Sequence, residues 1–205
     1  SWGTGVYKST DGGRTWSGAM LPKSQHIGRI VIDPRDPNIV YVAALGPLWA
    51  PGGERGLYKT VDGGKTWTNT KEISKYTGFG EIAMDPSNPG ILYASTYGDG
   101  VWKTTTAFGA GTFTRLTASP AIAEDLAFVG ADLFAVGPDG LARSSDGGAT
   151  WTPLGAGQLP TGGVGPTGTI PTWFTVTGYA ACGKTFLYVG GQFKGVNSVM
   201  VSSDA

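Results

Sequence analysis

The octet Ser9-Thr10-Asp11-Gly12-Gly13-Arg14-Thr15-Trp16 decides the fold, because two close copies of it occur later in the sequence. The copies are Thr60-Val61-Asp62-Gly63-Gly64-Lys65-Thr66-Trp67 and Ser144-Ser145-Asp146-Gly147-Gly148-Ala149-Thr150-Trp151. All three follow the pattern Ser/Thr-x-Asp-Gly-Gly-x-Thr-Trp. A motif that recurs in this way indicates a repeat architecture in which each copy belongs to one structural unit.

Two further copies are incomplete. Residues 100–105 match the approach to the first two octets, but the Asp-Gly-Gly core is lost after Thr105. Another copy begins at Ser202-Ser203-Asp204 and stops at Ala205. The repeat therefore continues over the whole chain.

The octet has a physical interpretation as a tight hairpin. A short Asp side chain accepts hydrogen bonds from nearby backbone amides, and paired glycines permit the positive φ that a tight turn needs. The tryptophan then provides a large surface for packing. We therefore expect the octets to be structural, with a turn-forming aspartate and a buried tryptophan in each: Asp11, Trp16, Asp62, Trp67, Asp146 and Trp151.

A second repeated unit lies between the octets. Residues 30–43 match residues 82–95, and both are typical of a strand, an Asp-Pro turn and another strand. Weaker equivalents follow at residues 126–136 and 174–189. Each repeat then holds four strands, A to D, with the octet between C and D. Four-stranded units at this spacing predict an all-β propeller of antiparallel blades.

The chain contains about four blades' worth of strands, in a single domain. The predicted blade segments are residues 1–24, 25–76, 77–118, 119–160 and 161–205. Three arrangements remain open: a ring closed by strands from both termini, an open arc that pairs with a second copy, and a fragment of a longer propeller. A free arc would leave unpaired strand edges.

The octets resemble Asp-boxes, also called BNR repeats. Together with the Asp-Pro strands they are similar to secreted Asp-box propellers, a group with sortilin-type receptors, bacterial sortilin-like proteins, xyloglucanase-type glycosidases and sialidases. Residues 5–95 carry most of this resemblance. The motif implies the propeller hairpin and occurs in enzymes and receptors alike, so the function must be argued from the site. The resemblance also implies a secreted or extracellular protein, with a periplasmic location as an alternative, of bacterial origin.

Composition excludes several functions. Fifteen basic and fifteen acidic side chains cancel, so nothing favours nucleic-acid binding. No apolar run is long enough to span a bilayer. With one cysteine and one histidine, we expect neither a metal site nor a cofactor. The pattern Gly-x4-Gly-Lys-Thr at residues 178–185 resembles a phosphate-binding loop, but a strand follows it where the phosphate chemistry needs a helix.

The repeat register predicts the candidate site. Arg29, Glu81 and Asp125 precede strand A in three successive repeats, and we assign Trp173 to the same position in the fourth. Equivalent positions in a radial repeat converge around the axis, so these four side chains should surround one mouth of the channel. They form either a polar pocket with a stacking platform or a salt-bridged plug.

Loops on the same face add candidate ligand-binding residues. They are Trp49 and Glu54 in the long loop of residues 46–55, and Tyr97 and Asp99 in its shorter counterpart. The Gly- and Pro-rich segment 155–171 is either a loop over this face or a linker.

Two main functions fit these residues. One is a non-catalytic propeller that binds a glycan, a peptide or a protein at the channel mouth, as monomer or homodimer. The other is a xyloglucanase-like glycosidase with Glu81 and Asp125 as its paired carboxylates. A third possibility is an excised or engineered fragment with no activity of its own.

Overall fold

The computed structural model describes residues 3–105, 112–155, 172–182, 184–193 and 196–202. All regular elements in these residues are β-strands, which form four antiparallel sheets. The described residues contain no helix long and apolar enough to cross a membrane. The predicted all-β class is confirmed.

Each sheet consists of strands that are consecutive in the sequence. The first sheet contains β1 (Ile27–Ile32), β2 (Val40–Ala44), β3 (Gly56–Thr60) and β4 (Thr68–Lys71). The second contains β5 (Phe79–Met84), β6 (Leu92–Thr96), β7 (Val101–Thr104) and β8 (Thr114–Leu116). The third contains β9 (Asp125–Val129), β10 (Asp132–Gly137), β11 (Gly140–Ser144) and β12 (Thr152–Leu154). The fourth contains β13 (Thr172–Ala181), β14 (Lys184–Phe193) and β15 (Val196–Ser202).

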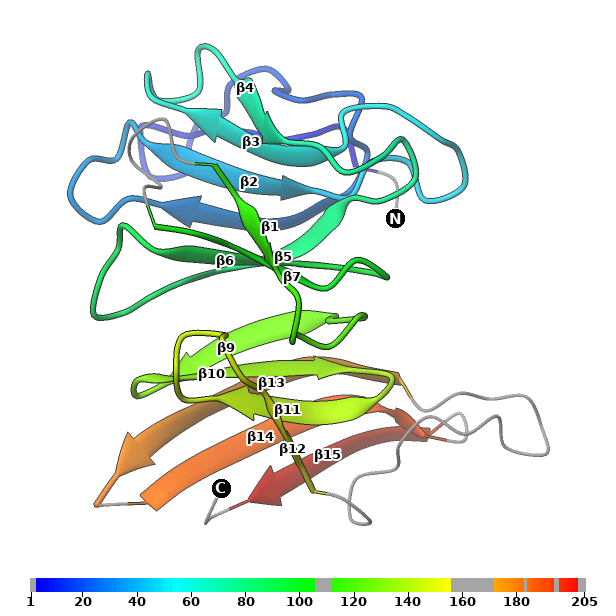
Figure 1. Cartoon of the computed structure of the whole chain (residues 1–205). Coiled ribbons are helices and arrows are strands. Elements are labelled where there is room, and N and C mark those ends of the chain that lie inside the picture. The colour runs from blue at the N-terminus through cyan, green and yellow to red at the C-terminus, as the bar shows by residue number, and fades with distance from the viewer. Residues whose placement is uncertain (1–2, 106–111, 156–171, 183, 194–195, 203–205) are drawn as a thin grey trace.

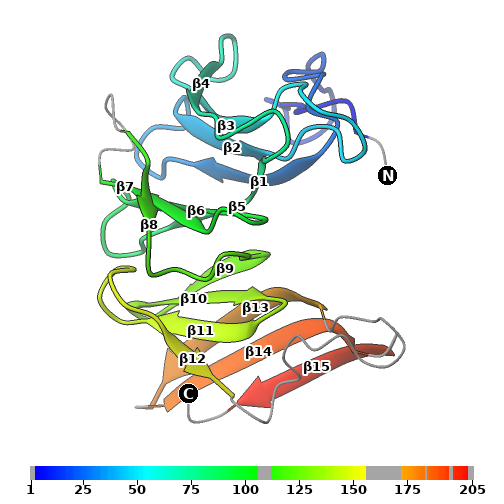
Figure 2. The same ribbon diagram turned by 45° about the vertical axis from the view of Figure 1, so that its right-hand side comes forward.

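The sheets stack face to face in sequence order, as blades of a propeller do (Figures 1 and 2). Each interface between sheets holds a hydrophobic cluster contributed by both neighbours. Leu57 of β3 and Phe79 of β5 share the first cluster, and both side chains are fully buried. Tyr93 with Leu133 in the second, and Phe134 with Leu187 in the third, repeat this arrangement. The core therefore consists of layers between blades.

The octets form the predicted turns. In the second octet, the Asp62 carboxylate accepts hydrogen bonds from the Thr66 amide at 2.9 Å, the Thr66 hydroxyl at 2.6 Å and the Thr60 hydroxyl at 2.7 Å. Asp11 and Asp146 accept the same three bonds in their octets. These bonds, led by the threonine hydroxyl, lower the pKa of Asp11 and of Asp146 to about 2.

Burial of the octet tryptophans differs from the prediction at one site. Trp67 and Trp151 are half-buried and pack against hydrophobic clusters, whereas Trp16 is 62% exposed. Each indole still donates its Nε1 hydrogen to a glycine carbonyl of its own octet. The prediction that Trp16 is buried is wrong: the N-terminal hairpin packs against Trp67, but among the described residues no sheet packs in the same way against Trp16.

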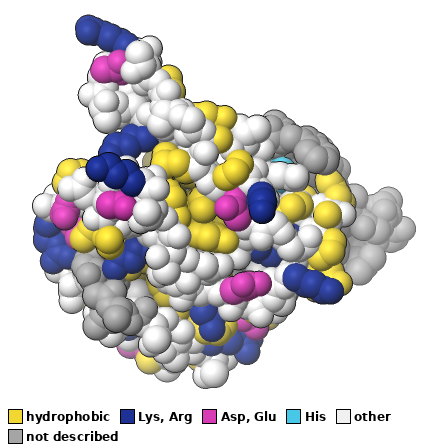
Figure 3. All heavy atoms as spheres, turned by 90° about the horizontal axis from the view of Figure 1, so that it is seen from above, with side chains coloured by type: hydrophobic (Ala, Val, Ile, Leu, Met, Phe, Trp, Pro, Cys, Tyr) yellow, Lys and Arg dark blue, Asp and Glu magenta, His cyan; other side chains and the backbone are white. Residues whose placement is uncertain are grey.

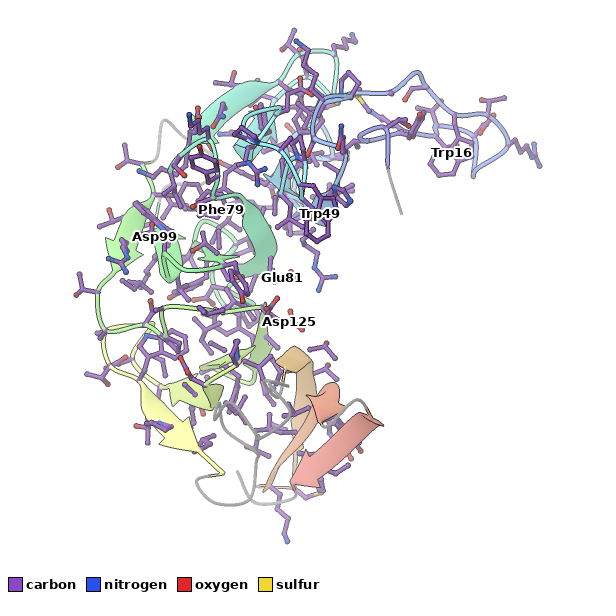
Figure 4. The ribbon with its side chains drawn as sticks, turned by 90° about the vertical axis from the view of Figure 1, so that its right-hand side faces the viewer. Trp16, Trp49, Phe79, Glu81, Asp99 and Asp125 are labelled. Atoms are coloured by element: carbon purple, nitrogen blue, oxygen red, sulfur yellow. The ribbon has the colours of Figure 1, made fainter. Side chains whose placement is uncertain are left out.

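The described blades form an open arc (Figure 4). At one end, residues near the N-terminus form a hairpin in which Val6 bridges to Met20. At the other end, β15 pairs with β14 alone among the described strands. Among the described residues, strands from the two termini therefore do not pair to close a ring.

The Gly-x4-Gly-Lys-Thr pattern lies in the hairpin between β13 and β14, where Ala181 pairs with Lys184. The exposed Cys182 stands at its turn with a φ of 53°. A strand follows the pattern, so the backbone does not have the helix start of a phosphate-binding loop.

Candidate functional site

The strand pairing defines which residues occupy equivalent positions on the innermost strands. Arg29 pairs with Ala43, Glu81 with Ser95 and Asp125 with Val136, and these partners are equivalent in their own strands. The three residues therefore form one row across β1, β5 and β9, as predicted. Figure 4 shows Glu81 and Asp125 on the concave side of the arc.

The fourth member of the row is Thr175 and not Trp173. In β13 the residue opposite Gly190 is Thr175, while Trp173 pairs with Gly191, one position further along β14 and across a register shift. The shift inserts an extra residue, as do similar shifts at the start of β1 and β5. The assignment of Trp173 to this row is therefore corrected, and its side chain lies outside the described part of the chain.

Asp125 connects the third blade to the fourth. Its Oδ2 accepts hydrogen bonds from the Thr175 hydroxyl at 2.8 Å and from the Val176 amide at 2.9 Å, and its Oδ1 accepts one from the Leu126 amide at 2.8 Å. The residue is 7% exposed. Since three donors already satisfy this carboxylate, it stabilises the contact between blades.

Glu81 connects the first two blades through Arg29. The Arg29 Nε donates a hydrogen bond to Glu81 Oε1, which also accepts one from the Ile82 amide at 3.0 Å. Gly28 makes this approach possible, because a Cβ there would overlap the Gly80 carbonyl oxygen. Burial raises the pKa of Glu81 to about 7, against the opposing effect of Arg29 and with a smaller contribution from the charge of Asp125.

The carboxylates of this row are already engaged in hydrogen bonds and an ion pair, most of which link neighbouring blades. Glu81 is an acid with a raised pKa, but it is engaged with Arg29, and Asp125 already accepts three hydrogen bonds. Together these contacts support the salt-bridged alternative for this row. Among the described residues no group of three or more His, Cys, Asp or Glu side chains is placed to hold a metal ion.

Arg55, at the C-terminal end of the loop of residues 46–55, anchors this loop through hydrogen bonds. The sequence analysis did not identify Arg55 as a candidate. Its guanidinium is buried and donates hydrogen bonds to the carbonyls of Leu45, Pro47 and Ala50, the last at 3.1 Å. Burial lowers the pKa of this guanidinium. The only signal in the sequence is a single arginine at the base of a long loop.

Trp49 projects from this fixed loop. Its side chain is 88% exposed, the largest exposure of any large hydrophobic side chain in the described residues. Figure 4 shows it near the concave side of the arc, on the same side as Glu81. A large apolar side chain held in water on a well-anchored loop is typical of a contact residue.

Two tyrosines extend the exposed aromatic surface. Tyr97 follows β6 and is 63% exposed, and Tyr76 precedes β5 and is 67% exposed. Because β2 and β6 end where β1 and β5 begin, these loops lie at the same end of the sheets as the loop of Trp49. The loop of Trp49 also contacts the loop of Tyr76, through a 2.7 Å hydrogen bond from the Gly52 amide to the Lys75 carbonyl. Tyr76 was not among the predicted residues.

The predicted acidic loop residues have structural contacts. Glu54 accepts a 2.7 Å hydrogen bond from the Lys23 amide. Asp99 accepts one from the Trp102 indole at 3.2 Å and lies 3.7 Å from Arg115 Nε, on the outer side of the arc (Figure 4). Residues 156–171, the predicted loop or linker, lie outside the described residues.

The chain was compared with known proteins. It matches no protein-family model. A xyloglucanase of Hypocrea jecorina (strain QM6a) is 31% identical over 91 residues, which is 40% of this chain and 10% of that protein. The chain thus spans about a tenth of this curated relative.

Solved structures of propellers match nearly the whole chain. A GH74 xyloglucanase from Xanthomonas campestris has a TM-score of 0.66 at 17% identity, covering 97% of this chain and 33% of that one. A YCF48 structure bound to a D1 peptide has a TM-score of 0.55 at 15% identity, covering 98% and 64%. At these identities the matches establish the β-propeller fold.

Proposed function

We propose that this chain is part of an Asp-box β-propeller that binds a glycan, without cleaving it, at the mouth lined by Trp49, Tyr76 and Tyr97. The observation that carries the proposal is the 88% exposure of Trp49 on a loop that Arg55 fixes by three hydrogen bonds. Rigid aromatic side chains provide large contact area at a low cost in conformational entropy. The xyloglucanase relative supports a glycan as the ligand.

The test is a glycan array probed with the whole chain, followed by calorimetry on the ligands found. Trp49→Ala should weaken binding at least about tenfold, the loss expected of an anchor worth about 1.4 kcal/mol or more. Trp16→Ala is the matched control, because Trp16 is also exposed but belongs to an octet turn. Equal binding by both variants would refute the proposal.

A peptide is the second ligand class, supported by the YCF48 structure bound to a D1 peptide. The same two variants, probed with a peptide library, separate the two ligand classes. Secretion, a bacterial source and a homodimer remain predictions. Sedimentation of the chain over a concentration series tests the homodimer.

Glycoside hydrolysis by Glu81 and Asp125 is the alternative function. It is supported by the raised pKa of Glu81, an attribute of general acids. Hydrolysis is opposed by the contacts of both carboxylates, because Glu81 is paired with Arg29 and Asp125 accepts hydrogen bonds from β13. A hydrolysis screen with Glu81→Gln and Asp125→Asn as controls decides, and turnover that both variants abolish would favour the hydrolase.

A further inference from the structure

Five aspartates in this chain are followed directly by glycine: Asp11, Asp62, Asp99, Asp139 and Asp146. Because glycine has no side chain, its amide nitrogen can reach the carboxyl carbon of the aspartate before it and close a five-membered ring. The attack requires a carboxyl group that is neutral and free to move. The hydrogen bonds of each carboxylate therefore decide which Asp-Gly bond can react.

The octet aspartates are held by hydrogen bonds. Asp146 Oδ1 accepts from the Ser144 hydroxyl at 2.8 Å and from the Thr150 amide at 2.9 Å, and its Oδ2 accepts from the Thr150 hydroxyl at 2.6 Å. These bonds, led by that of the Thr150 hydroxyl, lower the pKa of Asp146 from 3.8 to about 2. At a pH above both values, the lower pKa reduces the neutral fraction of this carboxyl group roughly sixtyfold.

Three further aspartates are also engaged. Asp62 and Asp11 accept the same set of hydrogen bonds in their own octets. Asp99 accepts one from the Trp102 indole. The hairpin of the first octet projects from the body of the molecule (Figure 3), so the octet of the third blade, which is packed, is the better comparison.

Asp139 differs from all of these residues. It is exposed and forms the turn between β10 and β11 together with Pro138. Its carboxylate has no hydrogen-bond or ion-pair partner among the described residues. The next residue, Gly140, has a φ of 102°, a conformation that favours glycine. The turn itself therefore requires the small residue that leaves the aspartate open to attack.

Asp139 and Asp146 form a matched pair within one blade. They lie beyond opposite ends of the same strand, β11, and both are exposed. Since water reaches both side chains, exposure does not distinguish them. The difference between them is the set of three hydrogen bonds in the octet.

We propose that Asp139 is a site of isoaspartate formation, and that the octet hydrogen bonds protect Asp146 from the same reaction. The Gly140 nitrogen attacks the side-chain carboxyl carbon of Asp139 and forms a C–N bond, while the carboxyl hydroxyl and the amide proton leave as water. A second water then breaks the bond between this nitrogen and the main-chain carbonyl carbon of Asp139. The chain now runs through the side-chain carbon and is longer by one methylene group.

The modification would alter the third blade at the end that carries the loops. The turn at Asp139 joins β10 to β11 as the loop of Trp49 joins β2 to β3, so both lie at the same end of their blades. Val136, which pairs with Asp125, lies two residues before the turn. The extra methylene therefore enters next to the row of Arg29, Glu81 and Asp125. This inference is independent of the glycan site.

The experiment incubates the folded chain at mildly acidic pH and measures isoaspartate in tryptic peptides. Trypsin cleaves after Arg143, so Asp139 falls in residues 116–143 and Asp146 in residues 144–184. Chromatography separates each isoaspartate peptide from its unmodified form of equal mass, and labelling by an isoaspartate methyltransferase checks the result. We expect at least about tenfold more isoaspartate at Asp139 than at Asp146. Equal amounts would overturn the proposal.

The same incubation in concentrated urea removes the fold and leaves both Asp-Gly bonds in place. The rates at Asp139 and Asp146 should then become similar, because the octet hydrogen bonds are lost. A preference for Asp139 that is unchanged in urea would show that the local sequence sets the difference, and would overturn the protective role of the octet.

Variants of the folded chain separate the two halves of the proposal. Thr150→Val removes the leading hydrogen bond to Asp146 and should raise isoaspartate there about fivefold or more, with Thr152→Val in β12 as the matched control. Asp139→Glu should abolish the modification at its turn, because the ring would need six members. Asp139→Asn should react faster through the same ring, with a gain in mass of the peptide. No rise in Thr150→Val, in a variant that circular dichroism shows to be folded, would contradict the protection.

Discussion

The interface between the second and third blades and the region around the N-terminal hairpin share the same motif but differ in packing. The octets at residues 9–16 and 144–151 have the same aspartate hydrogen bonds. Trp151 packs against a hydrophobic cluster, whereas Trp16 is 62% exposed. The comparison teaches that the octet determines the local turn, while burial depends on strands of the neighbouring blade.

The largest expected effect compares two equivalent side chains on the innermost strands. Leu126→Ala should lower the free energy of unfolding by about 3 kcal/mol, because it leaves a cavity in a packed layer. Ile30→Ala should cost less than about 1 kcal/mol, because Ile30 is 43% exposed. Urea unfolding of both variants provides the measurement. Equal losses would show that the open region is packed as tightly as the filled one.

The second prediction concerns the row that links the blades. The folded-state pKa of Glu81 is about 7, above its usual value of 4.5, so the folded protein holds this proton more tightly than the unfolded chain. The resulting stability is complete below about pH 4.5 and is lost as pH rises through 7. The size of this change is at most about 3.4 kcal/mol, at 1.36 kcal/mol per pKa unit.

Glu81→Gln should remove this component, since glutamine does not titrate. Unfolding free energies at several pH values between 4 and 8, for both proteins, measure the difference. A variant whose stability falls with pH as steeply as that of the unmodified chain would contradict the assignment to Glu81.

The smallest effect compares two octet aspartates. Asp146→Ala should lower the Tm, because the turn it stabilises belongs to a packed blade. Asp11→Ala should leave the Tm nearly unchanged, because its hairpin projects from the arc with Trp16 exposed. Thermal unfolding followed by circular dichroism measures both. A larger drop for Asp11→Ala would contradict the comparison.

The repeat made the sheets predictable from the sequence. Three octets, the Asp-Pro strands and their spacing predict four-stranded blades, and the same alignment correctly places Arg29, Glu81 and Asp125 in one row. These features could be predicted because turn hydrogen bonds and strand alternation depend on residues that are close together in the sequence.

Other features depend on contacts between distant residues and could not be predicted in this way. The extra residue at the start of β13 also occurs in β1 and β5, but β13 is a ten-residue strand without an Asp-Pro turn to mark its register, so the sequence did not place Thr175 opposite Gly190. The partners of Asp125 on β13 and the support of the Trp49 loop by Arg55 are tertiary contacts. The exposure of Trp16 follows from which strands surround the hairpin, and an isolated octet does not contain that information.

Hydrogen exchange at three equivalent glycine amides tests the central claim most directly. Gly13, Gly64 and Gly148 each donate to the first hydroxyl of their own octet, at 2.8, 2.9 and 2.7 Å. We predict that Gly148 exchanges only through global unfolding, that Gly64 is intermediate, and that Gly13 exchanges close to the rate of an unfolded chain. Protection of Gly13 equal to that of Gly148 would show that the octet is rigid without a neighbouring blade, and would contradict the account.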